Sequence, residues 1–313
     1  MTGPELWIEH APAKVNLDLH ILGPREDGYH ELDSLIMALE WGDELRALET
    51  STGTVELLVG GPAASADVPK GEANLVWRMA RAALGRGREL GLLDESQGLS
   101  LHLEKRIPSR AGLGGGSSDA AACLRAVEGL WQLDLGAEWA RRELAAAGAD
   151  CVFFLDPGPA AVARCRGIGA CVEALPGQAP PWSVLLVTPE VTCSTPEVFR
   201  AWQGSSSAAP ERGPGLDGGL LRDSLADVRR RLVNDLEAAA LRVEPSLAEW
   251  RALFDDEDLG HARLCGSGSS FFALFSDESQ AARELEGLKR AAAARGLATR
   301  LACVTAPKST RAR

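Results

Sequence analysis

A glycine-rich segment at residues 108–118, with the sequence PSRAGLGGGSS, carries the clearest chemical signal in the chain. Its glycines leave room for successive backbone N–H groups to point at one anion. A helix that starts directly after such a loop adds unpaired N–H groups and the positive end of its dipole, which favour a phosphate. The segment lacks the Gly-Lys-Ser/Thr ending of a Walker A motif and the G-x-G-x-x-G spacing of a Rossmann turn. We therefore expect a phosphate-binding loop of another class, in preference to a flexible linker.

The elements around this loop are indicated by hydrophobic periodicity. Apolar and polar residues alternate at 17–21, 55–59 and 99–103, which predicts short strands, the last of them ending near residue 107. Apolar residues at helical spacing predict helices over 74–84, directly after the loop, and over 137–147. Ser117 or Ser118 is the expected N-cap of the helix after the loop, with Asp119 at the positive end of its dipole. The loop thus joins a strand to a helix.

The second half of the chain begins after a breaker cluster, Pro157-Gly158-Pro159, and predicts a domain boundary between 1–155 and 156–313. A glycine turn at residues 265–270 leads into an apolar strand, and a capping box at 277–280 starts a helix that runs to about residue 295. The other elements expected here are strands at 161–165, 182–187 and 297–304 and a helical stretch at 221–242. The low-complexity segment 203–219 predicts a mobile surface loop.

Composition excludes several classes of function. The formal net charge of -11 argues against nucleic-acid binding, which needs a basic surface. The first ten residues do not resemble a signal peptide and there is no apolar run of ~18 residues, so we expect a cytoplasmic protein with no membrane partner. Seven cysteines without CxxC spacing favour reduced thiols over a disulfide framework or a zinc site.

Three motifs in order resemble those of the GHMP kinases: APAKVN at 11–16, the glycine loop, and GSGSS at 266–270. Within that superfamily the chain is similar to the 4-diphosphocytidyl-2-C-methyl-D-erythritol kinases, because it also contains REDGYHEL at 25–32 and GAD at 148–150. The resemblance implies an α+β fold, with a ribosomal-protein-S5-like N-terminal domain and a ferredoxin-like C-terminal domain. It also implies ATP-dependent phosphorylation of a cytidine diphosphate sugar alcohol at its 2-hydroxyl, in the methylerythritol phosphate pathway of isoprenoid precursor biosynthesis.

The resemblance implies that Lys14 and Asp150 are the catalytic pair. Asp150 would accept the proton of the attacking hydroxyl, and Lys14 would keep that carboxylate ionised and stabilise charge on the reacting oxygens. Asn74 is one of the residues that the resemblance implies to bind ATP, but an ordinary N-cap role at the start of a helix explains it equally well. The implied ATP-binding residues are Asn74, Lys105, Pro108, Ser109, Arg110, Ala111, Gly112, Leu113, Gly114, Gly115, Gly116, Ser117 and Ser118.

The acceptor substrate is expected to bind residues from four separate segments. Asn16 follows Lys14 by two residues on a predicted strand, so both face the same side, as does Asp18. The resemblance implies that Tyr29 and Phe199 stack on the two faces of cytosine and that His30 binds its edge. The implied substrate-binding residues are Asn16, Tyr29, His30, Thr195, Phe199, Gly266, Ser267 and Gly268.

Mg²⁺ is expected because ATP is the donor, although no cluster of acidic residues indicates its direct ligands. We expect a monomer or homodimer. Two alternatives remain open: another GHMP kinase, acting on mevalonate or homoserine, and a catalytically silent ligand sensor. One departure from the family is the replacement of its usual Val-Pro after the catalytic aspartate by Cys151-Val152, which frees a backbone dihedral there.

Overall fold

The computed structural model describes residues 6–158, 160–202 and 223–309, so the predicted loop at 203–219 lies outside the described residues. The chain divides into two compact units, each built from several segments. The first unit contains Met1–Ala13, Gly42–Ser109 and Gly114–Asp156. The second contains Lys14–Trp41, Arg110–Leu113 and Pro157–Arg313. The predicted domain boundary after residue 155 stays a prediction.

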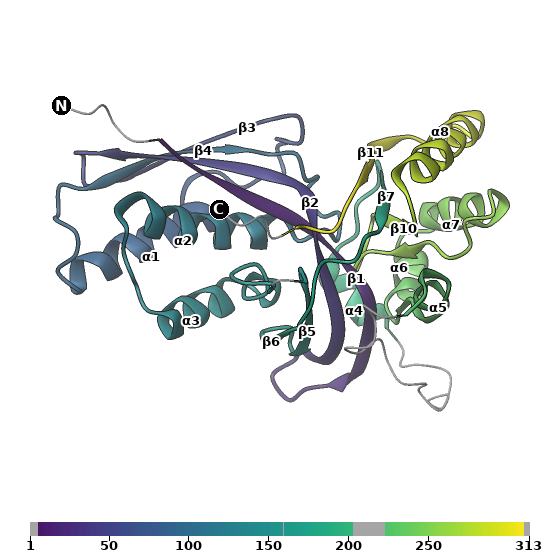
Figure 1. The fold of residues 1–313 in the computed structure, drawn as a ribbon, viewed down its shortest axis with the longest axis horizontal. Helices are drawn as coiled ribbons and strands as arrows, with labels where there is room; N and C mark the ends of the chain where they lie inside the picture. Colours follow the sequence, from purple (N-terminus) through teal and green to yellow (C-terminus); the bar gives the residue numbers. More distant parts are fainter. Residues whose placement is uncertain (1–5, 159, 203–222, 310–313) are drawn as a thin grey trace. The chain divides into compact units, whose positions relative to one another are not determined.

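The first unit packs helices against a sheet. Strand β4 (Gly98–Glu104) pairs in parallel with β3 (Val55–Gly60) and antiparallel with residues 44–50 of β2 (His30–Thr50). Helices α1 (Leu75–Glu89) and α2 (Gly115–Trp131) lie on one face of this sheet (Figure 1) and are followed by α3 (Ala137–Ala147). Two short 3₁₀ turns complete the unit, η1 (Gly71–Ala73) and η2 (Ala149–Cys151).

Most local predictions for the first unit are confirmed. The strands at 55–59 and 99–103 are β3 and β4, and the helix over 137–147 is α3, which ends at Gly148. The prediction that Ser117 or Ser118 caps the helix after the loop is wrong. Gly114, with φ of 74°, is the N-cap, and the helix begins one residue later. Glycine adopts this left-handed conformation without strain, so the glycine run itself can start the helix.

The second unit contains two sheets. Residues 32–37 of β2 pair antiparallel with β5 (Val162–Gly167), which pairs with β6 (Cys171–Ala174). The long strand β1 (Leu6–Pro24) pairs in parallel with β8 (Val233–Asn234) through Asp18 and Leu19. The other sheet has the order β11-β7-β10-β9. Its strands are β7 (Ser183–Pro189), β9 (Arg263–Leu264), β10 (Phe271–Phe275) and β11 (Thr299–Thr305).

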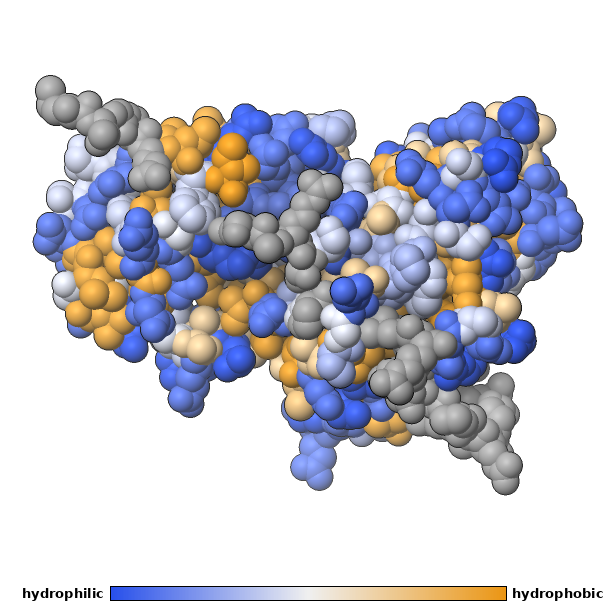
Figure 2. All heavy atoms as spheres, in the orientation of Figure 1, coloured by the Kyte–Doolittle hydropathy of each residue, from blue (hydrophilic) through white to orange (hydrophobic). Residues whose placement is uncertain are grey.

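Helices of the second unit bury their apolar faces in one hydrophobic core. Trp250 and Phe254 of α7 pack there with Phe271 and Phe275 of β10 and with Leu285 of α8. The outward face of α8 is mostly hydrophilic (Figure 2). The helices are α4 (Thr195–Ala201), α5 (Leu225–Arg231), α6 (Glu237–Val243), α7 (Ser246–Asp256) and α8 (Glu278–Ala294).

Two predictions for this unit need correction. The helical stretch at 221–242 is interrupted, because β8 separates α5 from α6. The short strand at 17–21 is part of β1, whose residues 11–19 are all buried, so the alternation of burial is lost there. The predicted start of α8 at Asp277 is confirmed, since Asp277 is the N-cap and accepts a hydrogen bond from the backbone N–H of Gln280. None of the described helices is long and apolar enough to cross a membrane.

Candidate active site

The glycine loop has the backbone that anion binding requires. Positive φ angles occur at Arg110, Gly112 and Gly114, and α2 starts at Gly115 with small residues in its first turn. Gly112 has no room for a side chain, because a Cβ atom there would lie 2.0 Å from the carbonyl oxygen of Cys265. The first backbone N–H of α2 with a helical acceptor is that of Ser118, which donates to Gly114, so the N–H groups of residues 115–117 precede the helical bonds and suit an anion.

A buried cluster of charges joins the elements at the two ends of this loop. Lys105, after β4, forms ion pairs with Asp43 of β2 and with Asp119 of α2. The Oδ1 atom of Asp43 also accepts hydrogen bonds from the backbone N–H groups of Arg106 (2.5 Å) and Ile107 (2.8 Å). Burial and the nearby Asp43 carboxylate raise the pKa of Asp119, although Lys105 opposes them. The predicted contact of Lys105 with ATP stays a prediction, and the structure adds a structural role.

Asn74 is the N-cap of α1. Its Oδ1 atom accepts a hydrogen bond from the backbone N–H of Val76, and its Nδ2 atom donates one to the carbonyl of Pro69. Both halves of the amide are thus used within the first unit. The capping alternative for this residue is confirmed, and its contact with ATP stays a prediction.

Asp150 lies in η2, directly after Gly148 ends α3. The side chain of Cys151 is buried, hydrogen-bonds to Ser117, and has its pKa raised to about 11 by burial, so this thiol is neutral near pH 7. Val152 has φ of −65°, which is the value that proline would impose. Replacement of the family's proline by Val152 therefore leaves the backbone after Asp150 in the same φ region.

Lys14 and Asn16 meet on one face of β1, as their spacing predicts. The Nζ atom of Lys14 donates a hydrogen bond to Oδ1 of Asn16 at 2.8 Å, and both side chains are buried. Gly266 approaches them closely, since a Cβ atom there would lie 3.4 Å from Nζ of Lys14. Asn234 holds this glycine turn by donating to the carbonyls of Leu264 and Gly266, each at 2.8 Å. The first and third motifs thus form one polar cluster in the second unit.

Aromatic side chains gather where the cytosine-binding residues are predicted. The rings of His30 and Phe199 lie 5.2 Å apart, and Trp202 approaches His30 edge-on at 5.5 Å. Tyr29 is 62% exposed. The hydroxyl groups of Thr195 and Ser267 are hydrogen-bonded at 2.8 Å, so these two predicted substrate residues also lie together.

The chain matches known protein families over most of its length. Residues 74–158 match the GHMP kinases N terminal domain, and residues 218–294 match the GHMP kinases C terminal domain. A 4-diphosphocytidyl-2-C-methyl-D-erythritol kinase of Paramagnetospirillum magneticum is 40% identical over 277 residues, covering 87% of this chain and 90% of the relative. The enzyme of that name from Cereibacter sphaeroides is 39% identical, covering 90% of this chain and 94% of the relative.

The chain belongs to the 4-diphosphocytidyl-2-C-methyl-D-erythritol kinase family. A crystal structure of a 4-(cytidine 5'-diphospho)-2C-methyl-D-erythritol kinase aligns with a TM-score of 0.72 and 32% identity, covering 96% of this chain and 100% of that one. A homoserine kinase from Cytophaga hutchinsonii aligns with a TM-score of 0.71 and 19% identity, covering 98% of this chain and 96% of that one. At this identity the similarity concerns the fold alone. Both comparisons agree with the GHMP kinase fold expected from the motifs. As in other GHMP kinases, ATP is the phosphate donor.

Several residues of this kinase's polar clusters were not predicted from the sequence. Asp43 and Ser34 belong to β2, whose buried residues show no simple alternation. Arg164 of β5 pairs with Asp18, and Trp202 completes the aromatic cluster three residues after Phe199. Trp202 is the C-cap of α4 and has an extended backbone, so the helical spacing of α4 did not indicate its contact with His30.

Proposed function

We propose that this chain transfers the γ-phosphoryl group of ATP to the 2-hydroxyl of 4-diphosphocytidyl-2-C-methyl-D-erythritol, giving the 2-phosphate and ADP. The observation that carries the proposal is the aromatic cluster at the DGYH segment, where His30 contacts Phe199 and Trp202 beside the exposed Tyr29. A nucleobase can stack on such rings, whereas mevalonate and homoserine have no base to place there. The names of the relatives support the same substrate.

The chemistry that we propose uses Asp150 as the general base. The carboxylate takes the proton of the 2-hydroxyl while that oxygen bonds to the γ-phosphorus and the bond to the ADP oxygen breaks. Lys14 stabilises the negative charge on the reacting oxygens. Its position is supported by the hydrogen bond to Asn16 and by the backbone hydrogen bond from Lys14 N–H to the carbonyl of Leu113 in the glycine loop, at 3.0 Å.

The glycine loop and the start of α2 bind the phosphates of ATP in this proposal. Backbone N–H groups at a helix N-terminus provide donors that need no side-chain reorganisation during the reaction. Gly112, Gly114 and Gly115 permit the close approach, and the ion pairs of Lys105 hold the adjoining elements. The cationic Lys14 adds charge compensation.

Mg²⁺ is expected with ATP, and the residues at the start of α2 fit it. The Oγ atom of Ser118 and the Oδ1 atom of Asp119 are buried and have no hydrogen-bond partner within the described residues. Hydroxyl and carboxylate oxygens are ligands that Mg²⁺ accepts. These two residues would hold the ion, which when bound neutralises charge on the phosphates. No group of three or more His, Cys, Asp and Glu residues in the described ranges forms a further metal site.

We further propose that the enzyme works in the cytoplasm, within the methylerythritol phosphate pathway, as a monomer or homodimer and without nucleic acid. The formal net charge of -11 supports the last point, because it would repel a phosphate backbone.

Lys14→Met and Asp150→Asn test the catalytic roles. Each should lower kcat by about 1,000-fold or more, because each removes a group needed only in the transition state. Binding of the cytidine substrate, measured by calorimetry, should change little. Lys70→Met and Asp94→Asn are matched controls at exposed positions and should keep wild-type kcat. Wild-type turnover by Asp150→Asn would remove Asp150 from the mechanism, and binding of both ligands by wild type without phosphoryl transfer would favour the sensor alternative.

A further inference from the structure

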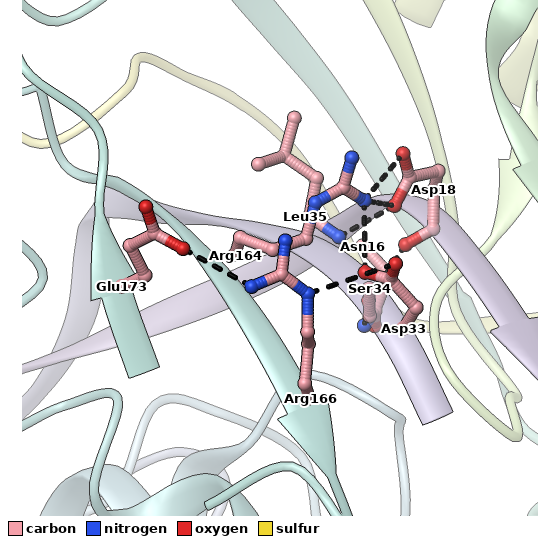
Figure 3. A network of polar contacts seen from close by, with 8 residues as sticks. All are labelled: Asn16, Asp18, Asp33, Ser34, Leu35, Arg164, Arg166 and Glu173. Carbon is pink, nitrogen blue, oxygen red and sulfur yellow. Dashed lines mark hydrogen bonds and ion pairs between the residues drawn. The ribbon is translucent and has the colours of Figure 1, made fainter. Parts of the chain in front are cut away.

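Ser34 of β2 is a buried hydroxyl that connects two polar residues of β1. Its side chain is 3% exposed. The Oγ atom donates a hydrogen bond to the backbone carbonyl of Asp18 at 2.6 Å and lies 2.8 Å from Nδ2 of Asn16 (Figure 3). Asn16 in turn accepts the hydrogen bond of Lys14. Ser34 is therefore one side chain away from the proposed catalytic lysine.

The proton on Ser34 can be assigned from its partners. A backbone carbonyl oxygen is only an acceptor, so the single hydroxyl proton of Ser34 points at Asp18. The same Oγ atom can then only accept from Asn16. The group of Asn16 that faces Ser34 must be its NH₂, which leaves the carbonyl oxygen of that amide on the other side.

This orientation of Asn16 matters for Lys14. The carbonyl oxygen Oδ1 faces Nζ of Lys14 at 2.8 Å, and an ammonium group can only donate. With the amide reversed, two donors would face each other and the ammonium group would be displaced. Gly266 lies beside both groups, since a Cβ atom added there would be in ordinary contact with Nζ of Lys14 at 3.4 Å and with Oδ1 of Asn16 at 3.6 Å.

The acceptor that fixes Ser34 is itself held firmly. Arg164 donates to both carboxylate oxygens of Asp18 at 3.0 Å, and the backbone N–H of Leu35 donates to Oδ1 at 2.5 Å. Arg164 also pairs with Asp33 at 3.2 Å, in the network shown in Figure 3. These contacts tie β1 to β2 and β5, so the Asp18 carbonyl has little freedom to leave Ser34.

We infer that Ser34 is a positioning residue of the kinase, which fixes the amide of Asn16 and thereby holds the ammonium group of Lys14 in its working position. The inference rests on the proposed role of Lys14. Ser34 itself touches no substrate in this account. It acts through the direction of two hydrogen bonds, which a purely structural serine would not need to control.

Kinetics of Ser34 variants test this role. Ser34→Ala should lower kcat about 10- to 100-fold, the effect of one or two mispaired hydrogen bonds, and leave the KM for ATP within about twofold. Ser34→Thr keeps the hydroxyl and should recover most of the rate, whereas Ser34→Cys keeps the shape and should behave as Ser34→Ala. Ser183→Ala, at another buried strand serine of the second unit, is the matched control and should keep wild-type kcat.

A double variant separates action through Asn16 from a direct effect. If Ser34 works only through Asn16, Ser34→Ala/Asn16→Ala should be no slower than Asn16→Ala. If the loss of kcat in the double variant equals the product of the losses in the two single variants, the inference is overturned. Wild-type kcat in both Ser34→Ala and Ser34→Cys would also overturn it. Melting temperatures show whether Ser34→Ala or Ser34→Cys has lost its fold. If one of them has, the kcat of the other decides the test.

NMR of the lysine side chains tests the position of Lys14 without any catalytic turnover, so it can fail or succeed independently of the proposed function. The chain has five lysines, so its lysine side-chain ¹⁵N NMR signals can be assigned by substitution, that of Lys14 by its loss in Lys14→Met. The Lys14 signal should move in Ser34→Ala and stay in place in Ser183→Ala. An unchanged Lys14 signal in Ser34→Ala would overturn the positioning role, whereas absence of wild-type kinase activity would overturn only the proposed function.

Discussion

Asp43 and Lys105 form a buried ion pair where the chain leaves β4 for the glycine loop. Asp43 also accepts from the backbone N–H groups of Arg106 and Ile107, and Lys105 also pairs with Asp119 of α2 at 2.6 Å. Two carboxylates thus share one ammonium group, and the cluster ties the last residues before the loop to the helix that follows it. Its geometry allows the contributions of the two acids to be separated.

Asp119→Asn should stabilise the protein increasingly as pH rises, whereas Asp43→Asn should destabilise it. Burial raises the pKa of Asp119 from 3.8 to about 8, with Asp43 contributing. The folded state therefore holds this proton more tightly than the unfolded state, and the stability gained is lost as pH rises from about 4 towards about 8. Asparagine at 119 removes that loss and leaves the pair of Asp43 with Lys105 intact.

Asparagine at position 43 cannot replace the carboxylate. One Asp43 oxygen accepts two backbone N–H groups and the other accepts Lys105, so an amide NH₂ must face one of these donors. The expected cost is about 2–3 kcal/mol. Thermal melting of both variants between about pH 5 and about pH 8.5 tests the difference. A stability difference between Asp119→Asn and wild type that does not grow with pH would contradict the assignment.

Ser118→Ala should weaken the binding of Mg²⁺ at the start of α2. The unpaired Oγ of Ser118 is the hydroxyl proposed to hold the ion. Loss of one oxygen ligand should raise the Mg²⁺ concentration for half-maximal rate about tenfold, while stability changes little because no protein hydrogen bond is lost. Rates measured over a Mg²⁺ titration at fixed ATP check this. An unchanged titration would exclude Ser118 as a ligand.

Local signals in the sequence predicted the parts of the site that depend on neighbouring residues. The glycine loop, the shared face of Lys14 and Asn16, and the end of α3 at Gly148 are of this kind. Positive φ at glycine and the period of two along a strand act within a few residues, so they can be recognised without knowing the fold.

Long-range partners could not be predicted in this way. Ser34 and Asp43 both lie on β2; Ser34 contacts β1, and Asp43 contacts the segment between β4 and the glycine loop. Their roles depend on strand register, and a shift of one residue would turn each side chain to the opposite face. The N-cap of α2 was misplaced for a related reason: serine is the common cap, but Gly114 reaches a left-handed conformation that a serine would adopt only with strain.

Tyr29→Ala should weaken binding of the cytidine substrate and spare ATP. Loss of one stacking ring is worth about 1–3 kcal/mol, so the KM for the substrate should rise about tenfold or more. Because Tyr29 is 62% exposed, its removal should not lower the melting temperature. Tyr29→Phe is the matched control, since it keeps the ring, and should stay close to wild type. Equal effects of alanine and phenylalanine would point to the hydroxyl rather than to stacking.

Gly112→Ala should destabilise the protein, whereas Gly85→Ala should stabilise it. A Cβ atom at Gly112, where φ is +76°, would lie 2.0 Å from the carbonyl oxygen of Cys265, so the backbone must move. We expect a cost of at least about 2 kcal/mol. Gly85 lies in α1 with nothing within 4 Å of its added Cβ, and alanine there should add about 0.5–1 kcal/mol. The urea concentrations at the midpoint of unfolding measure the stability of both variants. A midpoint of Gly112→Ala equal to that of wild type would contradict the close contact with Cys265.

The most direct test of the proposed function is the release of ADP by the purified, folded protein, coupled to an optical signal. The assay compares 4-diphosphocytidyl-2-C-methyl-D-erythritol with mevalonate and homoserine, each with ATP and Mg²⁺. Stoichiometric ADP release with the cytidine substrate alone is the result predicted by the aromatic cluster around His30 and the pairing of Lys14 with Asn16. No release with that substrate, or faster release with mevalonate or homoserine, would contradict it.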